Sequence, residues 1–453
     1  MAREIDILTI EVGSTITKAN AFLRDPASGG LRHVGQGFAP TTVALGDVGI
    51  GVRGALAELQ HTSRRSKEGA EVFVNSSAAG GLRMTVHGLT YNMTARAARE
   101  ASLGAGAIVK LVTAGRLAPT DLDEIRRIQP NLILLAGGVD FGARDTVLDN
   151  AADLARARFG VPVIYAGNAA LVGAVRDLFA GSGSEVLVAP NVFPDVDVLN
   201  VDPLRTLIQD AFARHIIHAP GMDDLQRLTA RPVLPTPGAV LKAAEIFADV
   251  LGDVVVFDVG GATTDVHSVT DGSPEFAARQ TDPEPRAKRT VEGDLGVFVN
   301  ARHIFELVAD AQWQARADEV RAMPATERER EVTRWLCARA VEAGARRHAG
   351  TLHDLYTPTG RRQIVRGKDL TAVKWVIGTG GALTRVEGGA EILRSICTGP
   401  GKHLLPKPEA QILLDRTYLF SAMGTIADAY PEAVRAVFTD WARQAQTGSF
   451  CPS

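Results

Sequence analysis

The first part of the chain alternates apolar and polar positions with the short period of β-strands. Residues 5–12 are rich in isoleucine and predict a strand, and residues 17–23 predict the returning strand of a hairpin. Residues 31–37 predict a third strand, residues 48–60 a helix, and residues 71–75 a short further strand. This order of elements indicates an α/β protein from the outset.

The pattern changes near residue 91 to a regular alternation of helices and short apolar strands. The predicted helices cover residues 94–103, 120–127, 144–158 and 169–180. The predicted strands cover residues 107–111, 132–135, 161–165 and 185–188. Short apolar runs between helices favour a parallel sheet covered on both faces. We therefore expect an inserted α/β subdomain at residues 91–200.

The second half repeats the opening pattern. An apolar strand at residues 253–258 leads through a glycine turn into a second hairpin, so that strand, glycine turn and strand occur at 5–23 and again at 253–269. We expect residues 1–90 to form the first part of one lobe and 201–250 to bridge back to the core. Residues 251–453 would form a second lobe with a helical insertion at about 297–350.

Composition and charge exclude several functional classes. Apolar residues make up 45% of the 453 residues and charged residues 22%, as in an ordinary globular protein. A net charge of −3 makes nucleic acids and acidic membranes poor partners. The three cysteines, Cys337, Cys397 and Cys451, lie far apart and show no metal-ligand spacing. No run resembles a signal peptide or a membrane span, so we expect a cytoplasmic protein.

The first hairpin carries a candidate phosphate-binding turn. Glu11 lies at the end of the first strand, directly before a turn of small residues, and Lys18 lies in the returning strand. A turn with small side chains lets backbone N–H groups approach an anion, and a carboxylate can hold a hydrated Mg²⁺ beside phosphates. The turn consists of Gly13, Ser14 and Thr15. Taken alone, this pattern also fits an ordinary hairpin.

The second hairpin is the more specific signal. A carboxylate ends a strand, consecutive glycines and hydroxyl residues follow, and a second carboxylate closes the run. A structural turn needs one or two residues with positive φ, but it needs neither flanking acids nor paired threonines. The run consists of Asp258, Gly260, Gly261, Ala262, Thr263, Thr264 and Asp265.

A third glycine-rich turn follows the apolar strand at 373–377. Its residues are Gly378, Thr379, Gly380, Gly381 and Ala382, and a helix is expected to follow. Such a turn suits a purine base or an α-phosphate lying against the backbone. The spacings of a dinucleotide-binding turn and of a Walker loop are both absent at this position.

These three elements, in this order, resemble the superfamily of acetate kinase, sugar kinases, heat-shock ATPases and actin. The resemblance implies a two-lobed actin-like ATPase fold built from duplicated ribonuclease-H-like domains, with ATP and Mg²⁺ in the cleft. It also implies that Glu11 and Asp258 hold the metal and act in catalysis, and that the three turns bind the nucleotide. The superfamily usually has aspartate where this chain has Glu11, which puts rapid hydrolysis in doubt.

A closer resemblance comes from segments between these turns. The segments are 75–84 (NSSAAGGLRM), 135–140 (LAGGVD), 165–170 (YAGNAA), 191–194 (NVFP), 235–240 (PTPGAV) and 289–296 (RTVEGDLG). Together they resemble the glutamate (methylaspartate) mutase accessory protein family. That resemblance implies an ATP-dependent reactivating chaperone whose partners are the subunits of an adenosylcobalamin-dependent mutase. The pattern Asp-x-His-x-x-Gly expected for a cobalamin-ligating histidine is absent from the α/β layer.

Two other functions fit the same turns. A small-molecule kinase would deliver the γ-phosphate to a hydroxyl or a carboxylate, with an acidic residue as base. A non-enzymatic assembly module would use the nucleotide to control polymerisation, as actin does. Slow hydrolysis without an acceptor, phosphate transfer to a metabolite, and formation of filaments or rings would separate the three.

Overall fold

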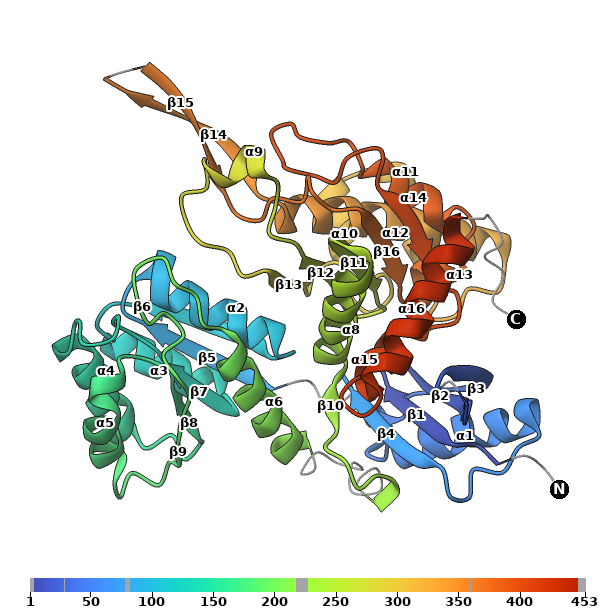
Figure 1. The fold of residues 1–453 in the computed structure, drawn as a ribbon, viewed down its shortest axis with the longest axis horizontal. Helices are drawn as coiled ribbons and strands as arrows, with labels where there is room; N and C mark the ends of the chain where they lie inside the picture. The colour runs from blue at the N-terminus through green and yellow to red at the C-terminus, as the bar shows by residue number, and fades with distance from the viewer. Residues whose placement is uncertain (1–3, 28, 78–81, 217–226, 359, 447–453) are drawn as a thin grey trace. The chain divides into compact units, whose positions relative to one another are not determined.

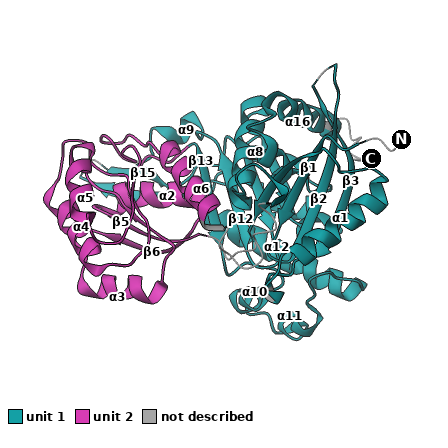
Figure 2. Ribbon diagram, turned by 90° about the horizontal axis from the view of Figure 1, so that it is seen from below, with its two compact units in different colours: residues 1–78, 220–281, 286–453 teal, residues 79–219, 282–285 magenta. Residues whose placement is uncertain are grey.

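A computed structural model describes residues 4–27, 29–77, 82–216, 227–358 and 360–446. The chain divides into two compact units, which Figure 2 colours separately. Unit 1 comprises residues 1–78, 220–281 and 286–453, and unit 2 comprises residues 79–219 and 282–285. The expected inserted subdomain at 91–200 falls within the residues of unit 2, and residues 78–81 of the segment 75–84 lie outside the described residues, as does Cys451.

Unit 1 contains a first five-stranded sheet with the order β10-β4-β1-β2-β3. The strands β1, β2 and β3 form an antiparallel meander, and β4 and β10 continue the sheet in parallel on the other side of β1. The helix α1 packs so closely on β3 that Gly37 has no room for a side chain. An added Cβ there would lie 2.1 Å from the Ala55 carbonyl oxygen. The elements are β1 Ile7–Val12, β2 Ile16–Arg24, β3 Leu31–Pro40, α1 Gly49–Ser63, β4 Glu71–Ser76 and β10 Leu234–Pro235.

A second sheet in unit 1 repeats this topology. Its order is β13-β12-β11-β16-β17, again an antiparallel meander of three strands extended by two parallel strands. The strands are β11 Val254–Val259, β12 Thr264–Val269, β13 Ala287–Glu292, β16 Trp375–Thr379 and β17 Gln411–Leu414. The matching order confirms the expected two-lobed actin-like fold with duplicated ribonuclease-H-like domains.

Helices cover both faces of the second sheet (Figure 1). The helices α8, α15 and α16 pack on one face around Phe247, Phe420 and Phe438. The helices α12 and α14 pack on the other face around Leu336 and Leu393. Their bounds are α8 Thr236–Leu251, α12 Glu327–His348, α14 Gly389–Ser395, α15 Phe420–Ile426 and α16 Pro431–Gln446. Shorter helices are α9 Pro274–Ala277, α10 Ala301–Val308, α11 Ala311–Gln314 and α13 Gly381–Arg385.

Unit 2 is an α/β layer around a five-stranded sheet with the order β6-β5-β7-β8-β9. All of its strand pairs are parallel, as the short apolar strands predicted. The strands are β5 Arg83–Gly88, β6 Ile108–Ala114, β7 Leu132–Leu135, β8 Val163–Tyr165 and β9 Val186–Val188. The helices are α2 Arg96–Gly104, α3 Pro119–Ile128, α4 Asp145–Ala157, α5 Val172–Phe179 and α6 Asp202–Ile216.

Several strands depart from the sequence-based expectation, and they include β13 and β17 of the second sheet. The strand β5 was not predicted, although it is an internal strand of the unit 2 sheet, between β6 and β7. A separate antiparallel hairpin, formed by β14 Thr351–Thr357 and β15 Gly360–Arg366, was also not predicted. Among the described residues, no helix is both long and apolar enough to cross a membrane.

Candidate functional site

The first glycine hairpin joins β1 to β2 through a tight turn. The Gly13 N–H donates to the Ile16 carbonyl oxygen at 3.1 Å. An added Cβ on Gly13 would lie 2.6 Å from that same oxygen, so the turn has no room for a side chain. The Thr41 hydroxyl donates to the Gly13 carbonyl oxygen at 2.8 Å and fixes the turn from outside. The backbone of this turn is therefore held in one conformation.

The second glycine hairpin joins β11 to β12 in the same way. The Gly260 N–H donates to the Thr263 carbonyl oxygen at 2.9 Å. The Thr264 hydroxyl donates to the Leu295 carbonyl oxygen and is buried, so it faces the interior. The Thr263 hydroxyl donates to Asp265 at 3.3 Å. The structure thus gives the two predicted threonine hydroxyls separate protein partners.

The two hairpins meet within unit 1. An added Cβ on Gly261 would lie 3.0 Å from the Thr15 hydroxyl oxygen. Within the described chain, the backbone N–H groups at the tips of both hairpins donate no hydrogen bond to the protein; they belong to Ser14, Thr15, Gly261 and Ala262. Small residues and unpaired N–H groups from two converging turns form a cradle for an anion such as a phosphate chain.

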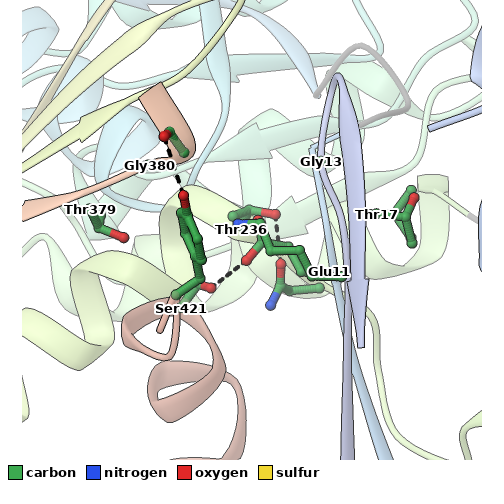
Figure 3. Close-up of polar contacts among 12 residues, drawn as sticks. Glu11, Gly13, Thr17, Thr236, Thr379, Gly380 and Ser421 are labelled. Atoms are coloured by element: carbon green, nitrogen blue, oxygen red, sulfur yellow. Dashed lines mark hydrogen bonds and ion pairs between the residues drawn. The ribbon is translucent and has the colours of Figure 1, made fainter. Parts of the chain in front are cut away.

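The carboxylate of Glu11 is already neutralised by its surroundings. The Lys18 ammonium lies 2.7 Å from Glu11 Oε1, and the Ser421 hydroxyl donates to Glu11 Oε2. Figure 3 shows Glu11 and Ser421 pointing toward one another. Burial lowers the pKa of Lys18, but attraction by Glu11 and Asp258 outweighs it and raises the pKa above the ordinary value.

Asp258 occupies the matching position in the second sheet and has a different environment. It lies opposite Asp265 in the strand register, and Asp265 is itself bound by the Arg289 guanidinium at 2.7 Å. No hydrogen-bond donor reaches the Asp258 carboxylate among the described residues. Burial, together with repulsion from Asp265, raises the pKa of Asp258 to about 7.

The third glycine-rich turn lies against the end of β11, where Gly380 approaches Asp258 and Val259. Its φ of 87° lies in the left-handed region, and an added Cβ would lie 2.4 Å from the Val259 carbonyl oxygen and 2.8 Å from Asp258 Oδ1. The Gly381 carbonyl oxygen accepts from the Tyr418 hydroxyl at 3.2 Å. Gly378, by contrast, faces the core, because an added Cβ would lie 2.8 Å from Leu393.

Many of the predicted residues gather around one space, whereas Gly378 and Thr264 face the core. Gly13 to Thr15, Lys18, Asp258, Gly261 and Gly380 are linked through the contacts above. The Thr379 hydroxyl donates to Asp415 at 3.0 Å, and Asp415 is a further carboxylate of this region, since its charge adds to the raised pKa of Asp258. Ala382 is partly buried in the short helix α13.

Several residues of this site carry no signal that the sequence analysis detected. Tyr418 lies beneath the Lys18 ammonium, which is 4.8 Å from the ring centroid. Asn300 donates to the carbonyl oxygens of Ala262 at 2.7 Å and Gly293 at 2.8 Å, so it ties the second hairpin to the following loop. Asp415 directly follows β17 and is a third carboxylate next to a strand end, a signal that the sequence contains.

Asp258 and the anion cradle are the features of the site that bear on metal binding. The described residues contain no cluster of three or more His, Cys, Asp or Glu side chains able to hold a metal ion by themselves. Mg²⁺ is commonly held by one or two carboxylates together with substrate phosphates and waters. The unpaired carboxylate of Asp258 beside the anion cradle fits that arrangement.

The chain is similar to known proteins over most of its length. The family model described as "MutL protein" matches residues 7–441. A curated protein named "Protein MutL", from Clostridium tetanomorphum, is 37% identical over 460 residues, which cover 94% of this chain and 97% of the relative.

Two solved structures also match with low identity. A glycerol dehydratase reactivase is 10% identical, with a TM-score of 0.37, over 94% of this chain and 100% of that chain. A diol dehydratase-reactivating factor in its nucleotide-free form is 12% identical, with a TM-score of 0.36, over 94% of this chain and 100% of that chain.

Proposed function

This chain belongs to the MutL protein family, and on that premise we propose that it is an ATP-dependent reactivating chaperone for an adenosylcobalamin-dependent mutase. Glutamate mutase is the proposed client. The observation that carries the proposal is the meeting of two glycine hairpins beside the Asp258 carboxylate. Among the described residues, the four N–H groups at the hairpin tips have no acceptor and that carboxylate has no donor. Such a site favours a triphosphate with its metal over a neutral metabolite.

The residues divide into three proposed roles. The turns of Gly13 to Thr15 and Gly260 to Ala262 would surround the β- and γ-phosphates with backbone N–H groups. Lys18 would shift from Glu11 toward the phosphates, because an ammonium between carboxylates and a phosphate is attracted by both. Gly380 and Gly381 would let the adenosine lie against the backbone of the third turn.

The two acids would differ in their share of the metal. Bound Mg²⁺ would neutralise charge on the phosphates during hydrolysis. Asp258 would hold it through water and orient the attacking water. Glu11 would contribute more weakly, since both of its oxygens already accept hydrogen bonds from Lys18 and Ser421.

Nucleotide binding would then act on the client through the two lobes of unit 1. The contact of Gly261 with Thr15 joins hairpins of two separate sheets, so a triphosphate gripped by both would hold them together. Hydrolysis would weaken that grip. A client that binds the two forms with different affinity could be opened by this change and release a damaged cofactor.

A reactivation assay tests the proposal. Glutamate mutase carrying inactivated cobalamin is mixed with the purified chain, ATP, Mg²⁺ and fresh adenosylcobalamin, and mutase activity is followed. We expect activity to return only with hydrolysable ATP, and phosphate release to rise when the inactivated mutase is present. Recovery without ATP, or phosphate transfer to a small-molecule acceptor, would reject the proposal.

A further inference from the structure

The β14–β15 hairpin is a two-stranded sheet separate from the three larger sheets (Figure 1). Most of its residues are exposed, including Leu355 at 45% and Tyr356 at 78%. Isolated two-stranded hairpins are marginally stable in water. A hairpin of this length that exposes a leucine and a tyrosine therefore requires either support from the rest of the fold or a binding partner.

The root of the hairpin is well supported. Leu352 and Val365 pack with Phe276 and Leu404 in a small buried cluster. The Val365 N–H donates to the Arg279 carbonyl oxygen at 2.8 Å, and the Leu352 N–H donates to the Lys402 carbonyl oxygen at 3.0 Å. The fold thus fixes where the hairpin starts, and the outer part is held out from a rigid base.

The two faces of the outer part differ in chemistry. Side chains alternate between faces along a strand, and paired residues share a face. On one face, Tyr356 is paired with Arg361, and the Arg361 guanidinium lies 2.9 Å from Asp354. That face therefore has its cation matched by an acid within the hairpin.

The opposite face lacks such a match, and we call it the basic–apolar face. It carries Leu355 and Ile364 next to Arg362 and Arg366. Within the described chain, neither of these two guanidinium groups has a carboxylate within 4.0 Å. Leu355 is exposed and Ile364 is partly buried. An exposed leucine beside cations that have no carboxylate partner is the pattern of an interface that meets an acidic surface.

We propose that the basic–apolar face is the docking surface for the client enzyme, and that it meets an acidic patch surrounding an apolar contact. The inference rests on the proposed function and adds to it the place and chemistry of the contact. A second copy of this chain is a poorer occupant, because a two-fold pairing of the same patch would bring like charges together.

Charge reversal on each face provides a matched pair of variants. Arg362→Glu lies on the basic–apolar face, and Arg361→Glu makes the same chemical change on the other face. Affinity for purified glutamate mutase is measured by biolayer interferometry with ATP and Mg²⁺, at low and high salt. We expect Arg362→Glu to weaken binding about tenfold or more, Arg361→Glu to change it less than about threefold, and salt to weaken wild-type binding.

The outcomes separate this inference from the function on which it rests. Both variants should keep wild-type basal ATP hydrolysis, because neither residue belongs to the nucleotide site. Equal affinities for wild type and Arg362→Glu, or equal losses in both variants, would overturn the docking surface while leaving the chaperone function standing. A wild-type chain that does not bind the mutase would overturn both. Light scattering that shows a wild-type dimer broken by Arg362→Glu would identify a second copy as the occupant.

Discussion

The two glycine hairpins of unit 1 correspond residue by residue. In both, a glycine N–H donates to a carbonyl oxygen three residues later, at 3.1 Å for Gly13 and 2.9 Å for Gly260. In both, a carboxylate precedes the glycine by two positions and pairs across the strands with a residue seven positions later. That later residue is Lys18 in the first hairpin and Asp265 in the second.

This single difference reverses the electrostatics of otherwise similar turns. Glu11 pairs with a cation, whereas Asp258 faces a second carboxylate that is already bound by Arg289. The two hairpins therefore share a backbone but differ in their acids. Glu11 is paired with the Lys18 ammonium, whereas the negative charge of Asp258 is destabilised in the free protein. Perturbed carboxylates of this kind are frequent where chemistry occurs, so the second hairpin is the expected seat of hydrolysis.

Replacing the two acids in turn gives the largest expected contrast. Asp258→Ala should lower the rate constant for ATP hydrolysis about a thousandfold, since it removes the group that holds the metal and water. Glu11→Gln should lower it about tenfold, because the amide keeps the side-chain shape and the hydrogen bond to Ser421. Steady-state phosphate release measures both, and equal losses would break the distinction between the hairpins.

The neighbouring strand offers a second contrast. In the first sheet, β4 places Ser76 beside Val12. In the second sheet, β16 is the equivalent strand, and Gly380 directly follows Thr379, which pairs with Asp258. Gly380→Ala should lower the free energy of unfolding by about 3 kcal/mol, because of its positive φ and the 2.4 Å approach to Val259. Gly399→Ala is the control, since Gly399 has φ +75° but no neighbour closer than 3.8 Å, and it should cost about 1 kcal/mol by denaturant titration. Similar losses would show that φ alone matters.

The raised pKa of Asp258 predicts a pH-dependent stability in the absence of nucleotide and metal. The native carboxyl has a pKa of about 7 and the ordinary value is 3.8. Between these values the native state holds the extra proton, so the free energy of unfolding falls as pH rises from about 4 to about 7. Asp258→Asn removes this loss, and its advantage over wild type should grow by roughly 2 kcal/mol between pH 5 and pH 8. A constant difference in urea titrations across that range would contradict the shift.

The smallest expected effect tests the loop that supports the second hairpin. Asn300→Ala removes two hydrogen bonds to carbonyl oxygens and should cost about 1 kcal/mol of stability. It should also weaken ATP binding by a few fold, as measured by calorimetry, because the Ala262 turn becomes less ordered. The structurally similar Asn20→Ala, which disrupts hydrogen bonds within the first sheet, serves as the comparison. Unchanged ATP affinity in Asn300→Ala would limit that residue to a role in stability.

The hairpins could be predicted from sequence because their chemistry lies within ten consecutive residues. The parallel layer of unit 2 was also predictable, since its outer strands are short apolar runs between amphipathic helices. Tyr418, Ser421 and Asn300 could not be found this way. They are single polar residues in loops or helix starts, and only the tertiary fold brings them to the turns.

The strand β5 and the β14–β15 hairpin could not be predicted for a different reason. The strand β5 places Thr85 and His87 in the interior, where their side chains bond one another and Thr113, so the strand shows no apolar run. The β14–β15 hairpin is exposed on both faces and has little alternation. In β5 the apolar residues Met84 and Val86 alternate with the polar residues Thr85 and His87, and all four are buried. Hydrophobic periodicity identifies a strand with one buried apolar face and one exposed polar face, and neither β5 nor the β14–β15 hairpin has that combination.

The chain enters unit 2 twice and leaves it twice, with the four crossings at residues 78/79, 219/220, 281/282 and 285/286. Its short second passage is held there by Arg96, which bonds Glu284 at 3.0 Å and the Pro283 carbonyl oxygen. A protease nick at any one crossing would thus leave unit 2 covalently attached through the remaining three. Deletion of residues 79–219 alone would leave residues 282–285 in the chain without Arg96, their partner. A complete deletion of unit 2 therefore has to remove both segments.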